Sequence, residues 1–243
     1  MRLRAVVRLL RVALHLCRVV LTIALVYPRH DETRQLALRQ QWSARLIELL
    51  GISLAWSGDA PPAGLLVSNH ISFVDICAIN AIAPASFVAK QEVRSWPLIG
   101  WLSKHVDTLF LERGSRAAAQ RAREHMVEYL HAGKRVAVFP EGTTGSGDGV
   151  LPFHGAMFQA AIDAAANITP IAIAYIDDSG ARDYAAAFIG EKSLLECLWA
   201  IVCARHITVT VSVLPTYPAK DGDRRHLSAH AHRAISHQIN RLH

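Results

Sequence analysis

The stretch that decides the fold covers residues 65–83 and reads LLVSNHISFVDICAINAIA. Its first four residues form a short apolar run typical of a buried strand, and Phe73–Ala83 has the pattern of a helix. Ser72 is expected to cap this helix, and Asp75, three positions later, is placed to close a capping box. The stretch therefore predicts a strand, a tight turn that holds His70, and a helix with a carboxylate in its first turn.

The rest of the chain repeats this alternation of short apolar or β-branched runs with helical patterns. Further strands are predicted at Ser86–Lys90, Val106–Leu111, Arg135–Phe139, Pro170–Ile176 and His206–Leu214. Further helices are predicted at Glu32–Leu50, Trp96–Lys104, Ser115–Ala132, Phe153–Ala166, Lys192–Ala204 and Arg224–Leu242. The alternation predicts an α/β fold with a mostly parallel central sheet flanked by helices. In such sheets sites form at the carboxyl ends of strands, which is where His70 falls.

Composition limits the function classes. The chain has 243 residues, 51% of them apolar, and its 26 basic and 20 acidic residues give a net charge of +6. This length fits one large α/β domain or two small ones. The high apolar content suggests contact with lipid, although a large buried sheet would also explain it. No stripe of basic and aromatic residues marks a nucleic-acid partner, and four cysteines without a C-x-x-C pair favour free thiols in a reducing compartment.

The N-terminal segment is basic and apolar, with six arginines and no acid in residues 1–30. Its polar residues recur every three or four positions and so share one helical face; they are Arg4, Arg8, Arg11, His15 and Arg18. This pattern is typical of a helix lying in a membrane interface, and a core helix with one wet edge is the alternative. The longest charge-free run, residues 19–28, is too short to span a bilayer. We therefore expect residues 1–58 to form amphipathic, membrane-associated helices, with a boundary in the turn-rich stretch 56–62.

His70 and Asp75 are five positions apart and have two interpretations. A carboxylate in the first turn of a helix is kept ionised by the helix dipole, and it can simply cap the helix. Folded back against the imidazole, the same carboxylate would fix the tautomer and stabilise the imidazolium, which would make His70 a general base. Spacing alone leaves both interpretations open.

A second stretch, residues 135–149, reads RVAVFPEGTTGSGDG. It predicts a buried strand followed by a glycine-rich turn that holds Glu141. Such turns expose backbone N–H groups that can bind a phosphate or an oxyanion, although most are only loops, and a lone glutamate in one is usually solvated.

Taken together, these residues resemble the glycerolipid acyltransferases of the bacterial 1-acyl-sn-glycerol-3-phosphate (lysophosphatidate) acyltransferase type. The most specific elements are N-H-x-x-x-x-D at residues 69–75 and F-P-E-G-T at residues 139–143. LFLERGS at 109–115 and ITPIAIAY at 168–175 resemble two further blocks of that family. The resemblance covers about residues 65–176, in the family's order.

The resemblance implies a membrane-associated O-acyltransferase. Such an enzyme transfers a fatty acyl group from acyl-CoA or acyl carrier protein to the free hydroxyl of a lysolipid, without a covalent acyl-enzyme, cofactor or metal. His70, oriented by Asp75, would be the catalytic base. The implied substrate-binding residues are Asn69, Arg113, Glu141, Gly142, Thr143 and Thr144. Residues 59–243 would form the acyltransferase domain, and the N-terminal helices are similar to the family's membrane anchor, on the cytoplasmic face of the inner membrane.

One position departs from the family's pattern. Many members read F-P-E-G-T-R, whereas this chain has Thr144 in place of the arginine. Arg113 is then left as the cation expected to hold an anionic head group. The expected acceptor is 1-acylglycerol-3-phosphate, which would give phosphatidic acid, and a lyso-ornithine lipid or another lysophospholipid is the alternative.

Three other classes compete with this interpretation. A metal-dependent hydrolase would add C-terminal histidines to His70 and Asp75, and the candidates are His226, His230 and His232. A serine hydrolase of the nucleophile-elbow type would need G-x-S-x-G, which the sequence lacks. A non-catalytic membrane-binding protein would explain the N-terminal segment but neither motif.

Overall fold

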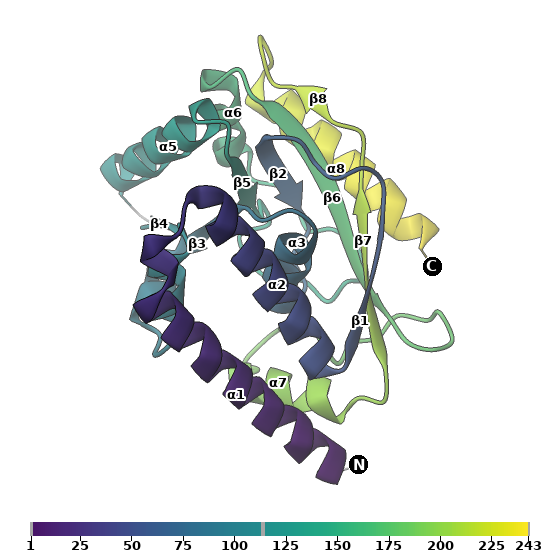
Figure 1. Ribbon diagram of the computed structural model, residues 1–243. Coiled ribbons are helices and arrows are strands. Elements are labelled where there is room, and N and C mark those ends of the chain that lie inside the picture. The colour runs from purple at the N-terminus through teal and green to yellow at the C-terminus, as the bar shows by residue number, and fades with distance from the viewer. Residues whose placement is uncertain (1, 113–114, 243) are drawn as a thin grey trace.

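The computed structural model describes residues 2–112 and 115–242. Within this part of the chain, one mixed sheet has the strand order β1-β7-β6-β2-β5-β3-β4, and β8 pairs with β6 (Figure 1). The strands are β1 Ile52–Ser57, β2 Gly64–Ser68, β3 Ser86–Lys90, β4 Leu109–Leu111, β5 Arg135–Val138, β6 Asn167–Ile176, β7 Ile207–Val213 and β8 Tyr217–Pro218. In the run β6-β2-β5-β3-β4, each strand is parallel to its neighbours, whereas β7 is antiparallel to β6. The predicted α/β fold with a mostly parallel sheet is confirmed.

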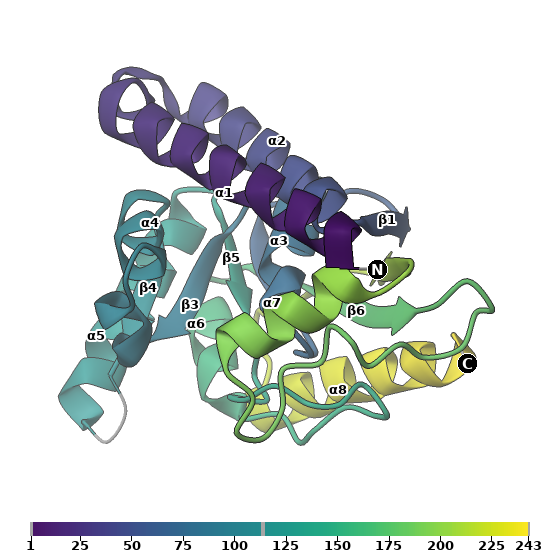
Figure 2. The same cartoon turned by 90° about the horizontal axis from the view of Figure 1, so that it is seen from below.

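Helices cover both faces of the sheet. They are α1 Arg2–Leu25, α2 Glu32–Leu50, α3 Val74–Ile82, α4 Ile99–His105, α5 Arg116–His131, α6 Phe158–Asp163, α7 Leu194–Cys203 and α8 Arg224–Arg241. Short 3-10 helices lie at Tyr27–Arg29, Gln91–Ser95 and Gly155–Met157. One hydrophobic core joins α2, α3 and α7 to the sheet, and a second joins α5, α6 and α8 to its other face. Figure 2 shows α1 and α2 on one side of the sheet and α8 on the opposite side.

The central strand β2 explains why the sheet is buried on both faces. All five of its residues are buried, as expected of a parallel strand covered on both sides. Leu66 points into the core of α2, α3 and α7, while Leu65 and Val67 point into the core of α5, α6 and α8. This alternation follows from the two-residue period of a strand.

Several predicted boundaries change for physical reasons. The strand expected from Val106 begins only at Leu109, because Asp107 adopts a positive φ of 58°. The helix expected over 153–166 is reduced to Gly155–Met157 and α6, since His154 is extended and its N–H donates to the carbonyl of Pro140. Strand β1 was not predicted. This strand lies in the N-terminal segment, which was expected to be helical, and it pairs with β7. Residues on both sides of the expected boundary after residue 58 pack in one hydrophobic core.

The start of α3 also differs from expectation. Its N-cap is Phe73, without a side-chain hydrogen bond, and not Ser72. The carboxylate of Asp75 accepts a hydrogen bond from the Ser72 N–H at 2.9 Å. The Ser72 hydroxyl also accepts a hydrogen bond, from the Val74 N–H at 3.3 Å. Ser72 and Asp75 therefore both contribute to the capping, although the helix begins one residue later than expected.

Helix α1 packs on the protein through Ala5, Val12, Val19 and Ile23. The polar stripe that the sequence placed on one face of α1 is divided between the protein and the surface. Arg4 and Arg8 donate to the last carbonyls of α7 at 2.9–3.2 Å, and the His15 ring lies 3.1 Å from the Trp42 carbonyl oxygen. The other two arginines of the stripe, Arg11 and Arg18, are exposed.

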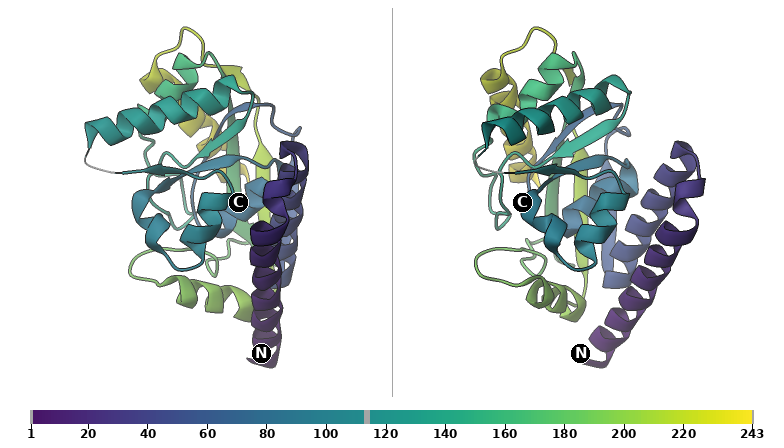
Figure 3. Two further views of the ribbon diagram at one scale, coloured as in Figure 1. Left: turned by 60° about the vertical axis from the view of Figure 1, so that its left-hand side comes forward. Right: turned by 90° about the vertical axis from the view of Figure 1, so that its left-hand side faces the viewer.

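The outer surface of α1 is apolar. The exposed large side chains are Leu3, Val6, Val7, Leu10, Leu14, Leu21 and Leu25. Figure 3 shows α1 and α2 running together along one side of the molecule, with α7 beside the N-terminal end of α1. None of the helices within residues 2–112 and 115–242 combines the length and apolarity needed to cross a membrane.

Candidate active site

The two sequence motifs meet at one edge of the sheet. His70 follows β2 and Glu141 follows β5, and these strands are parallel neighbours, with Val67 opposite Val138. Their carboxyl ends therefore lie side by side, as expected for a site in an open α/β sheet.

The centre of the site is a buried carboxylate beside a histidine. His70 Nδ1 lies 2.8 Å from Asp75 Oδ2, and the same oxygen accepts the N–H groups of Ile71 and Ser72 at 2.7 and 2.9 Å. The other oxygen, Oδ1, accepts the hydroxyl of Tyr175 at 2.6 Å. Asp75 is completely buried, so these donors replace the water that its charge would otherwise need. Asp75 thus both caps α3 and orients His70.

This geometry fixes the state of the imidazole. Because Asp75 Oδ2 accepts, Nδ1 carries the proton, and the lone pair of the neutral ring lies on Nε2. The ring stacks on Phe139, with centroids 3.9 Å apart and 12° between the planes. The His70 side chain retains 19% exposure. The site can therefore present a fixed general base to a substrate hydroxyl.

Asn69 lies beneath the turn. Its Nδ2 donates to the carbonyl of Ile173 at 2.9 Å, and its Oδ1 accepts the Ile173 N–H at 2.8 Å. Asn69 is only 2% exposed. The amide thus joins the turn to β6 as another strand residue would, a geometry that favours positioning of His70 over contact with substrate.

Glu141 is likewise turned inward. Its two oxygens accept the N–H groups of His70 at 2.8 Å and Leu151 at 3.1 Å, and it is 5% exposed. Burial raises its pKa to about 7, with a smaller contribution from the charge of Asp75. Glu141 therefore clamps two backbone segments beside His70.

The glycine-rich turn holds the remaining candidates. Gly142 has a φ of +68°, which glycine adopts readily, and its N–H donates to the Phe139 carbonyl at 3.1 Å. Thr143 is exposed, and the Thr144 hydroxyl donates to the carbonyl of Phe188. Thr144 thus ties the turn to the segment between β6 and α7. Arg113, the expected head-group cation, lies outside the described residues.

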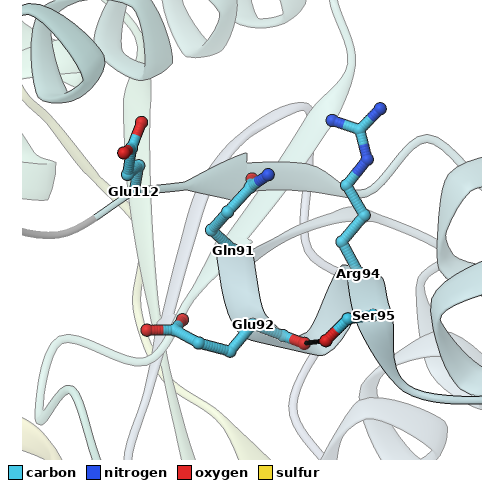
Figure 4. A pocket seen from close by; sticks show the side chains of 5 residues that line it. All are labelled: Gln91, Glu92, Arg94, Ser95 and Glu112. Atoms are coloured by element: carbon cyan, nitrogen blue, oxygen red, sulfur yellow. Dashed lines mark hydrogen bonds between the residues drawn. The ribbon is translucent and has the colours of Figure 1, made fainter.

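An open pocket of about 580 Å³ lies between the 3-10 helix after β3 and the end of β4 (Figure 4). Glu92, Arg94 and Glu112 line it together with Gln91 and Ser95. β3 and β4 are parallel and belong to the run that includes β2 and β5. The pocket therefore opens at the same edge of the sheet as His70. It is lined by both negatively and positively charged side chains.

The metal-hydrolase alternative predicts a cluster of His, Cys, Asp or Glu ligands around His70 and Asp75. Among residues 2–112 and 115–242, no group of three or more His, Cys, Asp or Glu side chains could hold a metal ion. Two of the C-terminal histidines serve in packing: His230 contacts Tyr217 edge-on, and His232 contacts Phe153 in the same way.

The sequence interpretation did not identify Tyr175. This residue lies 100 positions from Asp75 along the chain, so only the strand order brings the two together. Its place in ITPIAIAY, two residues after Ile173, puts both side chains on the same face of β6.

Comparison with known proteins agrees with the motif resemblance. A family model described as Acyltransferase matches residues 59–174. The chain is 38% identical over 199 residues to a lyso-ornithine lipid O-acyltransferase of Pseudomonas aeruginosa, covering 82% of this chain and 76% of that protein. It is 36% identical over 178 residues to a 1-acyl-sn-glycerol-3-phosphate acyltransferase of Neisseria gonorrhoeae, covering 73% and 69%.

The crystal structure of the 1-acyl-sn-glycerophosphate acyltransferase of Thermotoga maritima has the same fold. The TM-score is 0.71 at 19% identity, over 98% of this chain and 97% of that one. With the sequence relatives, these findings confirm the family predicted from the two motifs. The chain belongs to the acyltransferase family and is an enzyme of that class.

Proposed function

We propose that this enzyme acylates the free hydroxyl of 1-acylglycerol-3-phosphate and produces phosphatidic acid. His70 Nε2 takes the proton of the hydroxyl as its oxygen attacks the carbonyl carbon of an acyl thioester. The C–O ester bond forms, the C–S bond breaks, and the proton on His70 passes to the departing thiolate. The observation that carries this proposal is the bond between His70 Nδ1 and the buried Asp75, at 2.8 Å.

The acyl donor in this proposal is acyl-CoA or acyl carrier protein. Direct transfer needs no nucleophilic serine or cysteine. The thiols near the dyad fit this mechanism, because burial raises the pKa of Cys77 to about 12 and also raises that of Cys197. Both thiols therefore stay protonated and unreactive.

A lyso-ornithine lipid is the second candidate acceptor. Its head group carries both an amine and a carboxylate, and the pocket in Figure 4 is lined by Glu92 and Glu112 on one side and by Arg94 on the other. A phosphate would meet two repelling carboxylates there. The hydroxyl of Thr144, at the position of the family's common arginine, is bound to Phe188 and adds no cation.

The protein would act at the cytoplasmic face of the inner membrane, where lysolipids reside. The apolar outer face of α1, which includes Leu3, Leu10 and Leu14, would lie in the interface. Exposed Arg11 and Arg18 at one border of that face would attract anionic head groups.

The test is turnover with defined substrates. Purified protein is given 1-acylglycerol-3-phosphate or lyso-ornithine lipid, each with acyl-CoA or acyl carrier protein, and products are read by mass spectrometry. His70→Ala should reduce product formation by about 10³-fold or more, whereas His237→Ala, on the exposed side of α8, should not change it. Wild-type turnover by a folded His70→Ala protein would refute the proposal, and the preferred acceptor would decide between the two lipids.

A further inference from the structure

The strand β6 extends beyond β2 at the site. The pairing of β2 with β6 ends at Ser68 opposite Ile171, whereas β6 continues to Ile176 and stays paired with β7 on its other side. In the described part of the chain, the extra residues of β6 have none of the named strands β1–β8 on this edge. The turn after β2 takes the first part of the edge, because Asn69 bonds to both backbone groups of Ile173. Farther along, the Asp183 N–H donates to the Tyr175 carbonyl at 2.9 Å, and a bridge joins Ile176 to Arg182.

Tyr175 makes the second connection from this strand. Its hydroxyl donates to Asp75 Oδ1 at 2.6 Å, and both residues are buried, with exposures of 3% and 0%. Burial raises the pKa of Tyr175 well above its ordinary value, so the hydroxyl keeps its proton and can only donate to this carboxylate. The strand thus holds the turn at its backbone and holds the catalytic carboxylate through a side chain.

We propose that Tyr175 is a positioning residue of the dyad and acts on His70 through Asp75. Its hydroxyl fixes Oδ1, and with it the plane of the carboxylate, so that Oδ2 stays directed at His70 Nδ1. It also takes a share of the negative charge of Asp75. Without that share, the carboxylate would stabilise the imidazolium more strongly and hold the base protonated to higher pH. This inference rests on His70 acting as the base, as proposed above.

A purely structural role is the competing explanation. A buried carboxylate needs donors, and Tyr175 could supply one without affecting the histidine. The two roles differ in a double-mutant cycle. A residue that acts through Asp75 loses its effect on catalysis when Asp75 no longer carries a charge, whereas a structural residue costs the same factor in either background.

The surrounding titratable groups set the conditions for a pH profile. Cys77 faces the dyad from α3, Cys197 from α7 and Glu141 from the turn after β5. The raised pKa values of the two thiols keep them neutral over the pH range of interest. Glu141 titrates at about pH 7, so the informative quantity is the difference between two variants that both retain Glu141.

The experiment measures kcat/KM for acyl transfer from pH 5 to 9 in the full-length enzyme. Tyr175→Phe keeps the ring and removes the hydroxyl. We expect a loss of about tenfold in the wild-type background and less than about twofold in the Asp75→Asn background. We also expect the acid limb of the Tyr175→Phe profile to move up by about half a pH unit. Equal losses in both backgrounds, or superimposable profiles, would overturn the proposal.

A second tyrosine controls for stability. The hydroxyl of Tyr217 donates to the carbonyl of Leu227 at 3.1 Å in the core on the other face of the sheet. Tyr217→Phe should lower the melting temperature by an amount similar to Tyr175→Phe and leave kcat/KM unchanged. His70→Ala separates the two claims: if it stays active, the general-base assignment fails, and if it is inactive while the cycle shows no coupling, only the role of Tyr175 fails.

Discussion

Replacement of Asn69 by alanine tests whether this motif residue binds substrate or builds the turn. In the structure its amide satisfies the N–H and the C=O of Ile173, at 2.8 and 2.9 Å, and is 2% exposed. Alanine would remove both of these hydrogen bonds and leave the N–H and the C=O of Ile173 without the amide. Each orphaned buried group costs about 1–3 kcal/mol, so we expect the free energy of unfolding to fall by about 3 kcal/mol.

The catalytic consequence follows from the same contacts. Asn69 precedes His70 and fixes the turn against β6, so loss of the amide should displace the base and lower kcat. The KM for the lysolipid should change little, because the amide faces β6 and not the exposed side of His70. Urea unfolding at 25 °C, followed by circular dichroism, measures the stability, and steady-state acyl transfer measures the two kinetic constants.

Asn80 is the matched control. Its Oδ1 accepts one hydrogen bond, from the N–H of Ala85 at 3.1 Å, near the far end of α3. Asn80→Ala should cost about half as much stability and leave kcat unchanged. A folded Asn69→Ala protein as stable as the wild type, with a raised KM for the lysolipid, would refute the reasoning and return Asn69 to the substrate-binding residues.

Three further predictions concern charged residues. Glu141 has a pKa of about 7 in the fold against an ordinary 4.5, so the free energy of unfolding should fall by about 3 kcal/mol as pH rises through this range. Urea unfolding at pH 4.5 and 8 should show this decrease, and Glu141→Gln should reduce it. Replacing Arg11 and Arg18 by glutamate should weaken the free energy of binding to anionic vesicles, measured by sedimentation, by about 1 kcal/mol or more per residue and leave binding to neutral vesicles unchanged. Arg8→Gln should instead lower the melting temperature. Arg113→Ala should raise the KM for the lysolipid more than that for the acyl donor, and lysine should restore it only in part.

Much of the fold could be predicted because its signals are local. The apolar run of β2, the helical pattern of α3 and the strand before the glycine-rich turn all recur in the structure close to their expected bounds. Strand β1 was missed because its residues, ISLAWS, run into a turn-rich stretch that was taken as a domain boundary. What makes β1 a strand is its pairing with β7, about 155 positions away, which no local pattern reveals.

The sequence indicated which polar residues gather at the ends of β2 and β5, but not how their side chains are oriented. Sequence placed His70 and Asp75 together, and the structure brings them to 2.8 Å. It also assigned Asn69 and Glu141 to substrate, whereas the structure directs both side chains to backbone groups. A motif shows which polar residues a turn needs, but the direction of each side chain depends on neighbouring strands. The polar stripe of α1 shows the same limit, since part of it faces α7.

The contacts around His70 show why those polar residues stand in the motifs. The N–H of His70 donates to Glu141, and its carbonyl accepts the N–H of Gly145 at 2.7 Å. The N–H of Ile71 donates to Asp75, and its carbonyl accepts the N–H of Phe188 at 2.9 Å. All four backbone groups of these two residues are thus bonded, and their partners come from three segments: the glycine-rich turn, the start of α3 and the chain between β6 and α7. His70 is therefore held in place by the fold itself, so a reaction that uses it as a base would not need to spend binding energy on ordering it.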